Sequence, residues 1–166
     1  MGSLHKGHLS IVERALSENE QVIVTIYINP TQFNDINDLR QYPRNLESDI
    51  DKLRDYKNIF IYSPTDKDIY QEIVSKNYDL DNLDKILEGK YRPGHFNGVA
   101  TIVEKLFTIF NPNNAYFGEK DFQQLSIIKT MVKKLSISVN IISCETIREA
   151  DGLAMSSRNK NMTSEE

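Results

Sequence analysis

The chain has 166 residues, of which 39% are hydrophobic and 27% charged, and its formal net charge is −4 at pH 7. This composition predicts a single folded domain and excludes wholesale disorder. The acidic balance argues against a nucleic-acid-binding surface. No apolar run approaches the roughly 20 residues that span a bilayer, and the single cysteine, Cys144, cannot form an internal disulfide. We therefore expect a cytoplasmic protein that does not span a membrane.

Two histidines, His5 and His8, lie directly before an amphipathic run at the start of the chain. Leu9, Val12 and Leu16 recur at helical spacing, which places both histidines at the N-terminus of a helix. Such an end presents unpaired N–H groups and a partial positive charge, so it suits a phosphate. On this motif alone, an incidental pair of histidines is the alternative interpretation.

Apolar, β-branched runs over 22–28, 58–62, 115–117 and 139–144 predict strands. The first run does not alternate with polar residues, so both of its faces should be buried, as in a parallel sheet covered by helices. Helical periodicity over 46–53, 99–110 and 122–135 predicts further helices. We interpret 31–44 as a loop and 65–90 as solvated helices and turns. Asp49 and Asp51 are interpreted as a solvated helix face, with metal contact through water as the alternative.

Polar residues just past the carboxyl ends of parallel strands are candidates for ligand binding. Asn29 and Gln32 follow the first strand, although plain turn chemistry explains them equally well. Lys120 lies at a strand-to-helix turn where capping would favour an anion, which indicates a phosphate ligand. Asp121 and Gln124 match an N-cap and N3 pair, so helix capping is the alternative for both.

A second polar cluster, Ser156-Ser157-Arg158, follows a glycine-containing turn near the end of the chain. Two hydroxyls and a guanidinium in a row make a good phosphate clamp. As an isolated string, the cluster is equally typical of a surface turn.

Six motifs together carry a resemblance that covers nearly the whole chain. In order, they read MGSLHKGH, NPTQF, YPR, RPGHF, GEKDFQQ and READGLAMSSRN. They resemble the pantothenate synthetase family of the nucleotidylyl-transferase superfamily. The resemblance implies an α/β fold of the HIGH-type nucleotidylyl-transferases, with a Rossmann-like doubly wound parallel sheet and helices on both faces.

The resemblance also implies a reaction. An AMP-forming ligase of this family uses ATP and Mg²⁺ to convert (R)-pantoate into pantoyl adenylate, releasing pyrophosphate. The amine of β-alanine then attacks the adenylate to give pantothenate and AMP. The expected partners are these small substrates and a second copy in a homodimer. Another adenylyl- or cytidylyltransferase and a non-catalytic ATP-binding fragment are the alternatives.

The family's site residues transfer onto matching positions. The catalytic residues would be His5, His8, Lys120, Ser156, Ser157 and Arg158, with His8 as the proton donor. The ATP-binding residues would be Met1, Gly2, Ser3, Leu4, His5, Lys6, Gly7, His8, Gly118, Glu119, Lys120, Asp121, Ile147, Met155, Ser156, Ser157 and Arg158. The substrate-binding residues would be Gln32 and Gln124 for pantoate, with Gln32 also bordering β-alanine, and Asn29. The metal would accompany the ATP phosphates, and no protein ligand is assigned to it.

The family continues beyond both ends of this chain. It has a strand before its Met-Gly and a smaller lid domain after the last motif. We therefore expect residues 1–162 to form the nucleotide-binding domain without its first strand, and 163–166 to begin the lid with a capping-box signature. We also expect weak or absent activity from this chain alone.

Overall fold

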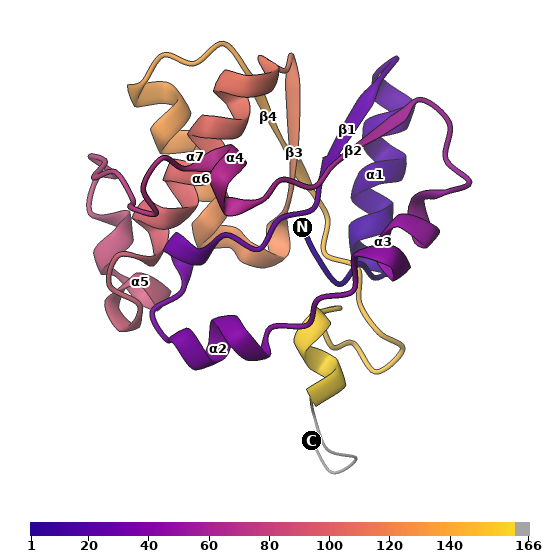
Figure 1. Ribbon diagram of the computed structural model, residues 1–166, viewed down its shortest axis with the longest axis horizontal. Helices are drawn as coiled ribbons and strands as arrows, with labels where there is room; N and C mark the ends of the chain where they lie inside the picture. The colour runs from indigo at the N-terminus through magenta and orange to yellow at the C-terminus, as the bar shows by residue number, and fades with distance from the viewer. Residues whose placement is uncertain (162–166) are drawn as a thin grey trace. The chain divides into compact units, whose positions relative to one another are not determined.

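A computed structural model of the chain describes residues 1–161 (Figure 1). The helices are α1 (Lys6–Glu18), α2 (Ile36–Gln41), α3 (Leu46–Leu53), α4 (Asp66–Ile69), α5 (Leu87–Tyr91), α6 (His95–Phe110) and α7 (Phe122–Lys134). The strands are β1 (Val22–Thr25), β2 (Ile59–Tyr62), β3 (Asn114–Gly118) and β4 (Asn140–Cys144). Short 3-10 turns are η1 (Pro30–Gln32), η2 (Leu83–Lys85), η3 (Glu119–Asp121) and η4 (Ser157–Asn161).

The chain divides into two compact units. The first contains residues 1–28, 43–63 and the stretch from 145 onward, and the second contains 29–42 and 64–144. Each unit holds one pair of parallel strands, β1 with β2 and β3 with β4. Parallel pairing needs a long crossover between strands, and helices supply it in both units.

In the first unit, α1 packs against β1, beside which β2 pairs in parallel (Figure 1). The core of this unit is built from Leu4, Val12, Val24, Ile26 and Leu53. Only one face of β1 is buried, because Val24 is 2% exposed whereas the preceding Ile23 is 44% exposed. Side chains alternate across a strand, so Ile23 and its register partner Phe60 share the other face. The expectation that both faces of β1 are buried is therefore wrong for this unit.

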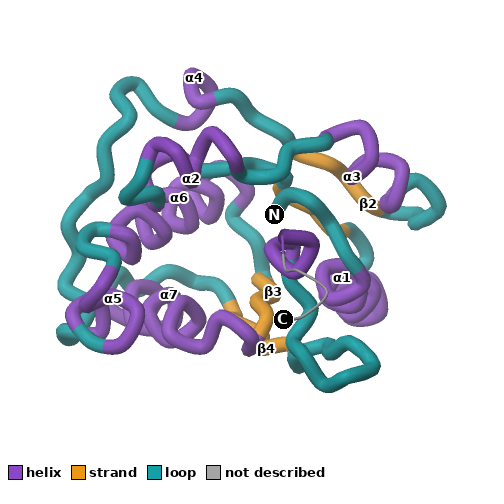
Figure 2. The backbone as a smooth tube through the Cα atoms, turned by 90° about the horizontal axis from the view of Figure 1, so that it is seen from below, coloured by secondary structure: helices purple, strands orange, loops and turns teal. Residues whose placement is uncertain are grey.

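In the second unit, α6 and α7 pack on each other, and α7 also contacts β3 (Figure 2). Both helices bury apolar side chains, including the fully buried Ala100, Ile127 and Ile128, although Phe122 at the start of α7 is 69% exposed. Asn111 ends α6 in the left-handed conformation with φ of 43°. Asparagine tolerates that region better than most residues, so the helix stops there and β3 begins three residues later.

The expected helices and strands are confirmed, and the α/β class with parallel strands follows from them. The strands of residues 1–161 form two separate pairs, where the family resemblance implied one sheet. The segment expected to be a loop at 31–44 contains α2, which begins where the Asp35 carboxylate accepts from the N–H of Asn37 at 2.7 Å. Its 6 residues are too few to show helical periodicity.

The capping-box signature at 163–166 lies outside the described residues, and so does the proposed domain boundary after residue 162.

Among residues 1–161, no helix combines the length and the apolar character that a bilayer crossing requires.

Candidate active site

The two histidines of the first motif form a reciprocal cap on α1. His5 is the N-cap, and its Nδ1 accepts from the N–H of Gly7 at 3.2 Å. His8 is the third helical residue, and its Nδ1 accepts from the N–H of His5 at 3.3 Å. The ring centroids are 4.0 Å apart. Because Nδ1 accepts in both rings, the proton of each neutral imidazole lies on Nε2. The structure therefore confirms the predicted position of the pair at a helix N-terminus.

A buried carboxylate anchors the turn in front of this cap. Asp49 of α3 is 2% exposed and accepts from the backbone N–H groups of Ser3 at 2.7 Å and Leu4 at 2.6 Å. Ser3 has φ of 52°, a left-handed conformation that is uncommon outside glycine. The interpretation of Asp49 as part of a solvated helix face is therefore wrong. The sequence does carry a signal, because Asp49 lies one turn before the buried Leu53 on the same helix face.

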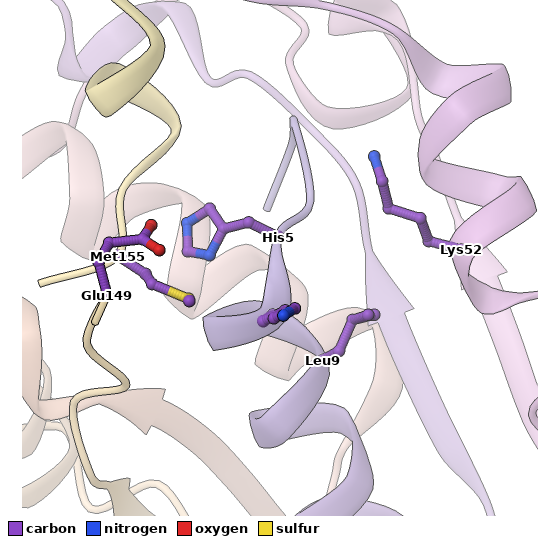
Figure 3. A pocket seen from close by; sticks show the side chains of 6 residues that line it. His5, Leu9, Lys52, Glu149 and Met155 are labelled. Carbon is purple, nitrogen blue, oxygen red and sulfur yellow. The ribbon is translucent and has the colours of Figure 1, made fainter. Parts of the chain in front are cut away.

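A pocket of about 420 Å³ opens at the histidine turn. It is lined by His5, Lys6, Leu9, Lys52, Glu149 and Met155. Figure 3 shows Glu149 and Met155 on one side of His5, with Lys52 reaching in from α3 on the other. His5, Lys6 and Met155 are among the site residues predicted from the sequence, whereas Lys52 and Glu149 are not. One imidazole and two ammonium groups outnumber the Glu149 carboxylate in this lining, which favours an anion.

The last motif begins with a hairpin that leads to this pocket. The N–H of Met155 donates to the carbonyl of Ile147 at 2.9 Å, and the N–H of Glu149 donates to that of Leu153 at 2.7 Å. Gly152 closes the turn with φ of 92°, which a glycine adopts without strain. A Cβ added to Gly7 would lie 3.6 Å from the Cβ of Met155. The structure thus brings the first and last motifs into contact within the first unit.

The three residues after Met155 enter η4. Ser157 is buried and Arg158 is exposed. The N–H of Arg158 donates to the Ser156 hydroxyl at 3.3 Å, a local turn bond. These residues follow directly on the pocket-lining Met155, although none of the three lines the pocket.

In the second unit, Lys120 and Asp121 lie between β3 and α7 as predicted. Asp121 occupies the N-cap position of α7, but its side chain makes no capping hydrogen bond. It pairs instead with Lys120, whose Nζ lies 2.9 Å from its carboxylate. The capping alternative therefore does not describe Asp121. Both side chains are exposed, so the pair contributes little to stability and remains accessible to a ligand.

Asn29 is a buried hub in the turn after the first strand region. It is 2% exposed, and its Oδ1 accepts from the N–H of Thr31 at 3.4 Å and from the hydroxyls of Thr31 at 3.0 Å and Tyr70 at 2.6 Å. Its Nδ2 donates to the carbonyl of Gly98 at 3.1 Å and to Oε1 of Gln32 at 3.4 Å. The turn interpretation thus accounts for Asn29. Asn29 is buried, whereas Gln32 is partly exposed.

His95, in the RPGHF motif, holds the backbone of the same turn. It is 6% exposed, and its Nδ1 lies 2.6 Å from the carbonyl oxygen of Gln32. A carbonyl only accepts, so Nδ1 carries the proton of the neutral ring. Burial lowers the pKa of His95 and favours that neutral form. The RPGHF motif alone does not predict this contact, since its partner lies 63 positions away.

Gln123 was likewise missed. Its buried side chain donates to the carbonyls of Leu83 at 2.7 Å and Ile86 at 2.8 Å, and accepts from the N–H of Glu88 at 3.0 Å. These bonds tie the η2–α5 segment to the start of α7, one residue before Gln124.

Within residues 1–161, no group of three or more His, Cys, Asp or Glu side chains is placed to hold a metal ion.

A profile of the Pantoate-beta-alanine ligase family matches residues 1–166. The chain belongs to this family. Pantothenate synthetase of Flavobacterium psychrophilum is 53% identical, with 100% of this chain and 60% of that protein aligned. The corresponding protein of Phocaeicola vulgatus is 50% identical over 100% of this chain and 59% of its own length. These matches confirm the family resemblance on which the site residues were assigned.

Solved structures of ligase family members have the same fold. The pantoate-beta-alanine ligase of Francisella tularensis, complexed with Beta-gamma ATP and beta-alanine, has a TM-score of 0.92 and 48% identity, covering 99% of this chain and 63% of that one. The Thermus thermophilus protein has a TM-score of 0.94 and 43% identity, covering 99% of this chain and 60% of that one. The chain thus spans about 60% of the length of the curated relatives that it matches.

Proposed function

We propose that this chain provides the nucleotide-activating part of an ATP-dependent ligase that joins (R)-pantoate to β-alanine through pantoyl adenylate. The observation that carries the proposal is the His5–His8 cap, which places two Nε2–H donors at a helix N-terminus beside an anion-suited pocket. Family membership and a 48% identical structure complexed with Beta-gamma ATP and beta-alanine support it.

The chemistry of adenylation matches these groups. A carboxylate is a poor acyl donor, because its leaving group would be oxide, and transfer of AMP onto the pantoate carboxylate supplies a better leaving group. The displacement builds negative charge on phosphate oxygens and expels pyrophosphate. Donors and cations that are fixed in advance stabilise that charge. His5 and His8 contribute imidazole N–H groups, with His8 as the proton donor, and Lys6 and Lys52 contribute ammonium groups.

The remaining nucleotide contacts are proposed from the family positions. Lys120 binds phosphate, Asp121 binds ribose, and Gly118 and Glu119 complete that turn. Ser156, Ser157 and Arg158 clamp the phosphates. Ile147 meets adenine through its backbone.

Gln32 and Gln124 are proposed to bind pantoate, with Gln32 bordering β-alanine. The amide-forming step releases AMP when the uncharged amine of β-alanine attacks the adenylate. Mg²⁺ would be carried by the ATP phosphates, since the described residues offer no cluster of protein ligands. We further propose that the protein is cytoplasmic and forms a homodimer.

The decisive assay measures AMP release from ATP, Mg²⁺ and (R)-pantoate with and without β-alanine. It is run on this chain and on a version extended at both ends to the relatives' length. The informative variant is His8→Gln, because glutamine at the third helical position retains a capping acceptor while losing the imidazole. We expect AMP release to fall by about 10²-fold or more, while the free energy of unfolding changes by less than about 1 kcal/mol.

The outcomes separate the alternatives. AMP release that requires both substrates and is lost in His8→Gln supports the ligase. Activity of the extended version alone supports the ligase and shows that this chain requires the additional segments. A stable nucleotide adduct without AMP release indicates an adenylyl- or cytidylyltransferase. ATP binding without pyrophosphate release by either version indicates a non-catalytic fragment and rejects the proposal.

A further inference from the structure

The orientation of the Gln32 amide is determined by backbone groups. The N–H of Thr31 can only donate and the carbonyl of Gly98 can only accept, and these groups face Oδ1 and Nδ2 of Asn29 respectively. The amide of Asn29 therefore has one allowed orientation. Its Nδ2 also faces the Gln32 side chain at 3.4 Å, so the Gln32 atom at that contact is the acceptor Oε1. Nε2 of Gln32 consequently becomes the end that points away from Asn29.

Tyr70 completes this chain of hydrogen bonds. It is 5% exposed, and its hydroxyl lies 2.6 Å from Oδ1 of Asn29, the shortest contact that Asn29 makes. Because Oδ1 is an acceptor, the tyrosine must donate. Burial raises the pKa of Tyr70, so the hydroxyl keeps its proton throughout the neutral range. The ammonium of Lys105 lies 5.2 Å from the centre of the Tyr70 ring and helps to hold it in place.

We propose that Tyr70 is a positioning residue that acts through Asn29 to present the Nε2 donor of Gln32 to an oxygen of pantoate. This inference rests on the proposed function, because it assumes that Gln32 binds that substrate. It assigns Asn29 an indirect role, since the Asn29 amide is buried and bonded to protein groups. It also specifies the chemistry of the contact, in which the protein donates and the substrate accepts.

The first variant is Tyr70→Phe, which removes only the hydroxyl. We expect the KM for pantoate to rise about fivefold, the effect of one lost hydrogen bond, while the KM for ATP stays within about twofold. The matched control is Tyr78→Phe in the same unit, whose hydroxyl donates to Glu104 Oε2 at 2.6 Å rather than to Asn29. The control should leave both KM values unchanged. Equal effects of the two variants on the KM for pantoate would overturn the proposal.

A second variant tests which end of the amide faces the substrate. Gln32→Glu retains an oxygen toward Asn29 and replaces the Nε2 donor with another oxygen. We expect the KM for pantoate to rise by about 100-fold, because an acceptor then faces an acceptor. An unchanged KM would show that Oε1 faces pantoate and would overturn the assignment.

A double-variant cycle separates positioning from general damage. If Tyr70 acts through Gln32, Tyr70→Phe has no further effect on the KM for pantoate in a Gln32→Ala background, whereas its effect on thermal stability is the same in both backgrounds. Equal effects on KM in both backgrounds would contradict the relay.

A spectroscopic measurement tests the relay without any turnover. In protein labelled with ¹⁵N-glutamine, the Gln32 side-chain signal, assigned by its loss in Gln32→Glu, should shift in Tyr70→Phe and remain in place in Tyr78→Phe. An unshifted signal in Tyr70→Phe would overturn the inference. Absence of AMP release from both the chain and its extended version would reject the proposed function alone.

Discussion

The backbone N–H of Leu4 donates to the buried carboxylate of Asp49 at 2.6 Å, although 45 positions separate the two residues. The same carboxylate accepts from Ser3, so it holds the turn that leads into the His5 cap. An ionised acceptor that binds two backbone N–H groups makes strong, charge-assisted bonds. The position at which α1 begins, and with it the position of the histidines, therefore depends on a side chain from α3.

Replacement of that carboxylate should destabilise the chain. Asp49→Ala leaves the N–H groups of Ser3 and Leu4 without their acceptor, which should lower the free energy of unfolding by about 3 kcal/mol. The control is Asp51→Ala on the same helix, which removes an exposed carboxylate that pairs with Arg54. This control should lower the free energy of unfolding by less than about 1 kcal/mol. Denaturant unfolding of both variants measures the difference. Equal losses would show that Asp49 does not anchor the turn.

The stability of the chain should fall in mild acid because of His95. Burial is the largest cause of its lowered pKa, and Arg92 adds to the shift, whereas the bond to the Gln32 carbonyl and the charges of Glu88 and Asp121 oppose it. The unfolded chain therefore takes up the proton first, and stability is lost as pH falls below the ordinary value of 6.5.

His95→Asn isolates this contribution, since the asparagine amide can replace the Nδ1 donor and does not titrate. Between pH 7 and about pH 5, the wild type should lose more stability than the variant in denaturant unfolding. Parallel pH profiles for the two proteins would assign the acid sensitivity to other groups.

Gly98→Ala should destabilise the second unit even though alanine is the better helix former. Helix propensity alone predicts a gain of about 1 kcal/mol. However, the new Cβ would lie 2.3 Å from the carbonyl oxygen of Thr31 and 2.8 Å from the N of Gln32, both of which are backbone atoms. The turn must shift, so we expect a net loss of about 2 kcal/mol. The control is Gly2→Ala, whose Cβ would lie 3.6 Å from the Ile28 side chain. Denaturant unfolding measures both variants, and a net gain of stability in Gly98→Ala would contradict the close contact between Gly98 and the backbone of Thr31.

Gln123→Leu should release the segment that contains η2 and α5. The variant removes the side-chain partner of the Leu83 carbonyl and of the Glu88 N–H, at a cost of about 3 kcal/mol. The Ile86 carbonyl also loses its bond to Gln123 but still accepts from the N–H of Lys90 at 3.3 Å. Hydrogen exchange should accelerate at Glu88 more than in the centre of α6. Gln124→Leu, one residue further along α7, should leave that exchange rate unchanged. Uniform acceleration in Gln123→Leu would indicate global destabilisation only.

Local features of the site could be predicted from the sequence because they depend on neighbours along the chain. The apolar spacing after His8 placed the histidines on a helix N-terminus, and the run 115–117 followed by a turn placed Lys120 before α7. Capping and periodicity act within about one helical turn, so the sequence contains them directly. The motifs likewise determined the family, because they recur in its order.

The tertiary structure alone decided which polar side chains hold those local features in place. Asp49 was interpreted as solvated and proved to be buried, and Asn29 was a candidate ligand and proved to be a hub bonded to Tyr70. His95 and Gln123 find partners at least 35 positions away. A hydrogen bond across such a separation exists only after packing has brought two segments together and excluded water. No periodicity or turn signal encodes it, because the sequence pattern of each segment is the same with or without its partner.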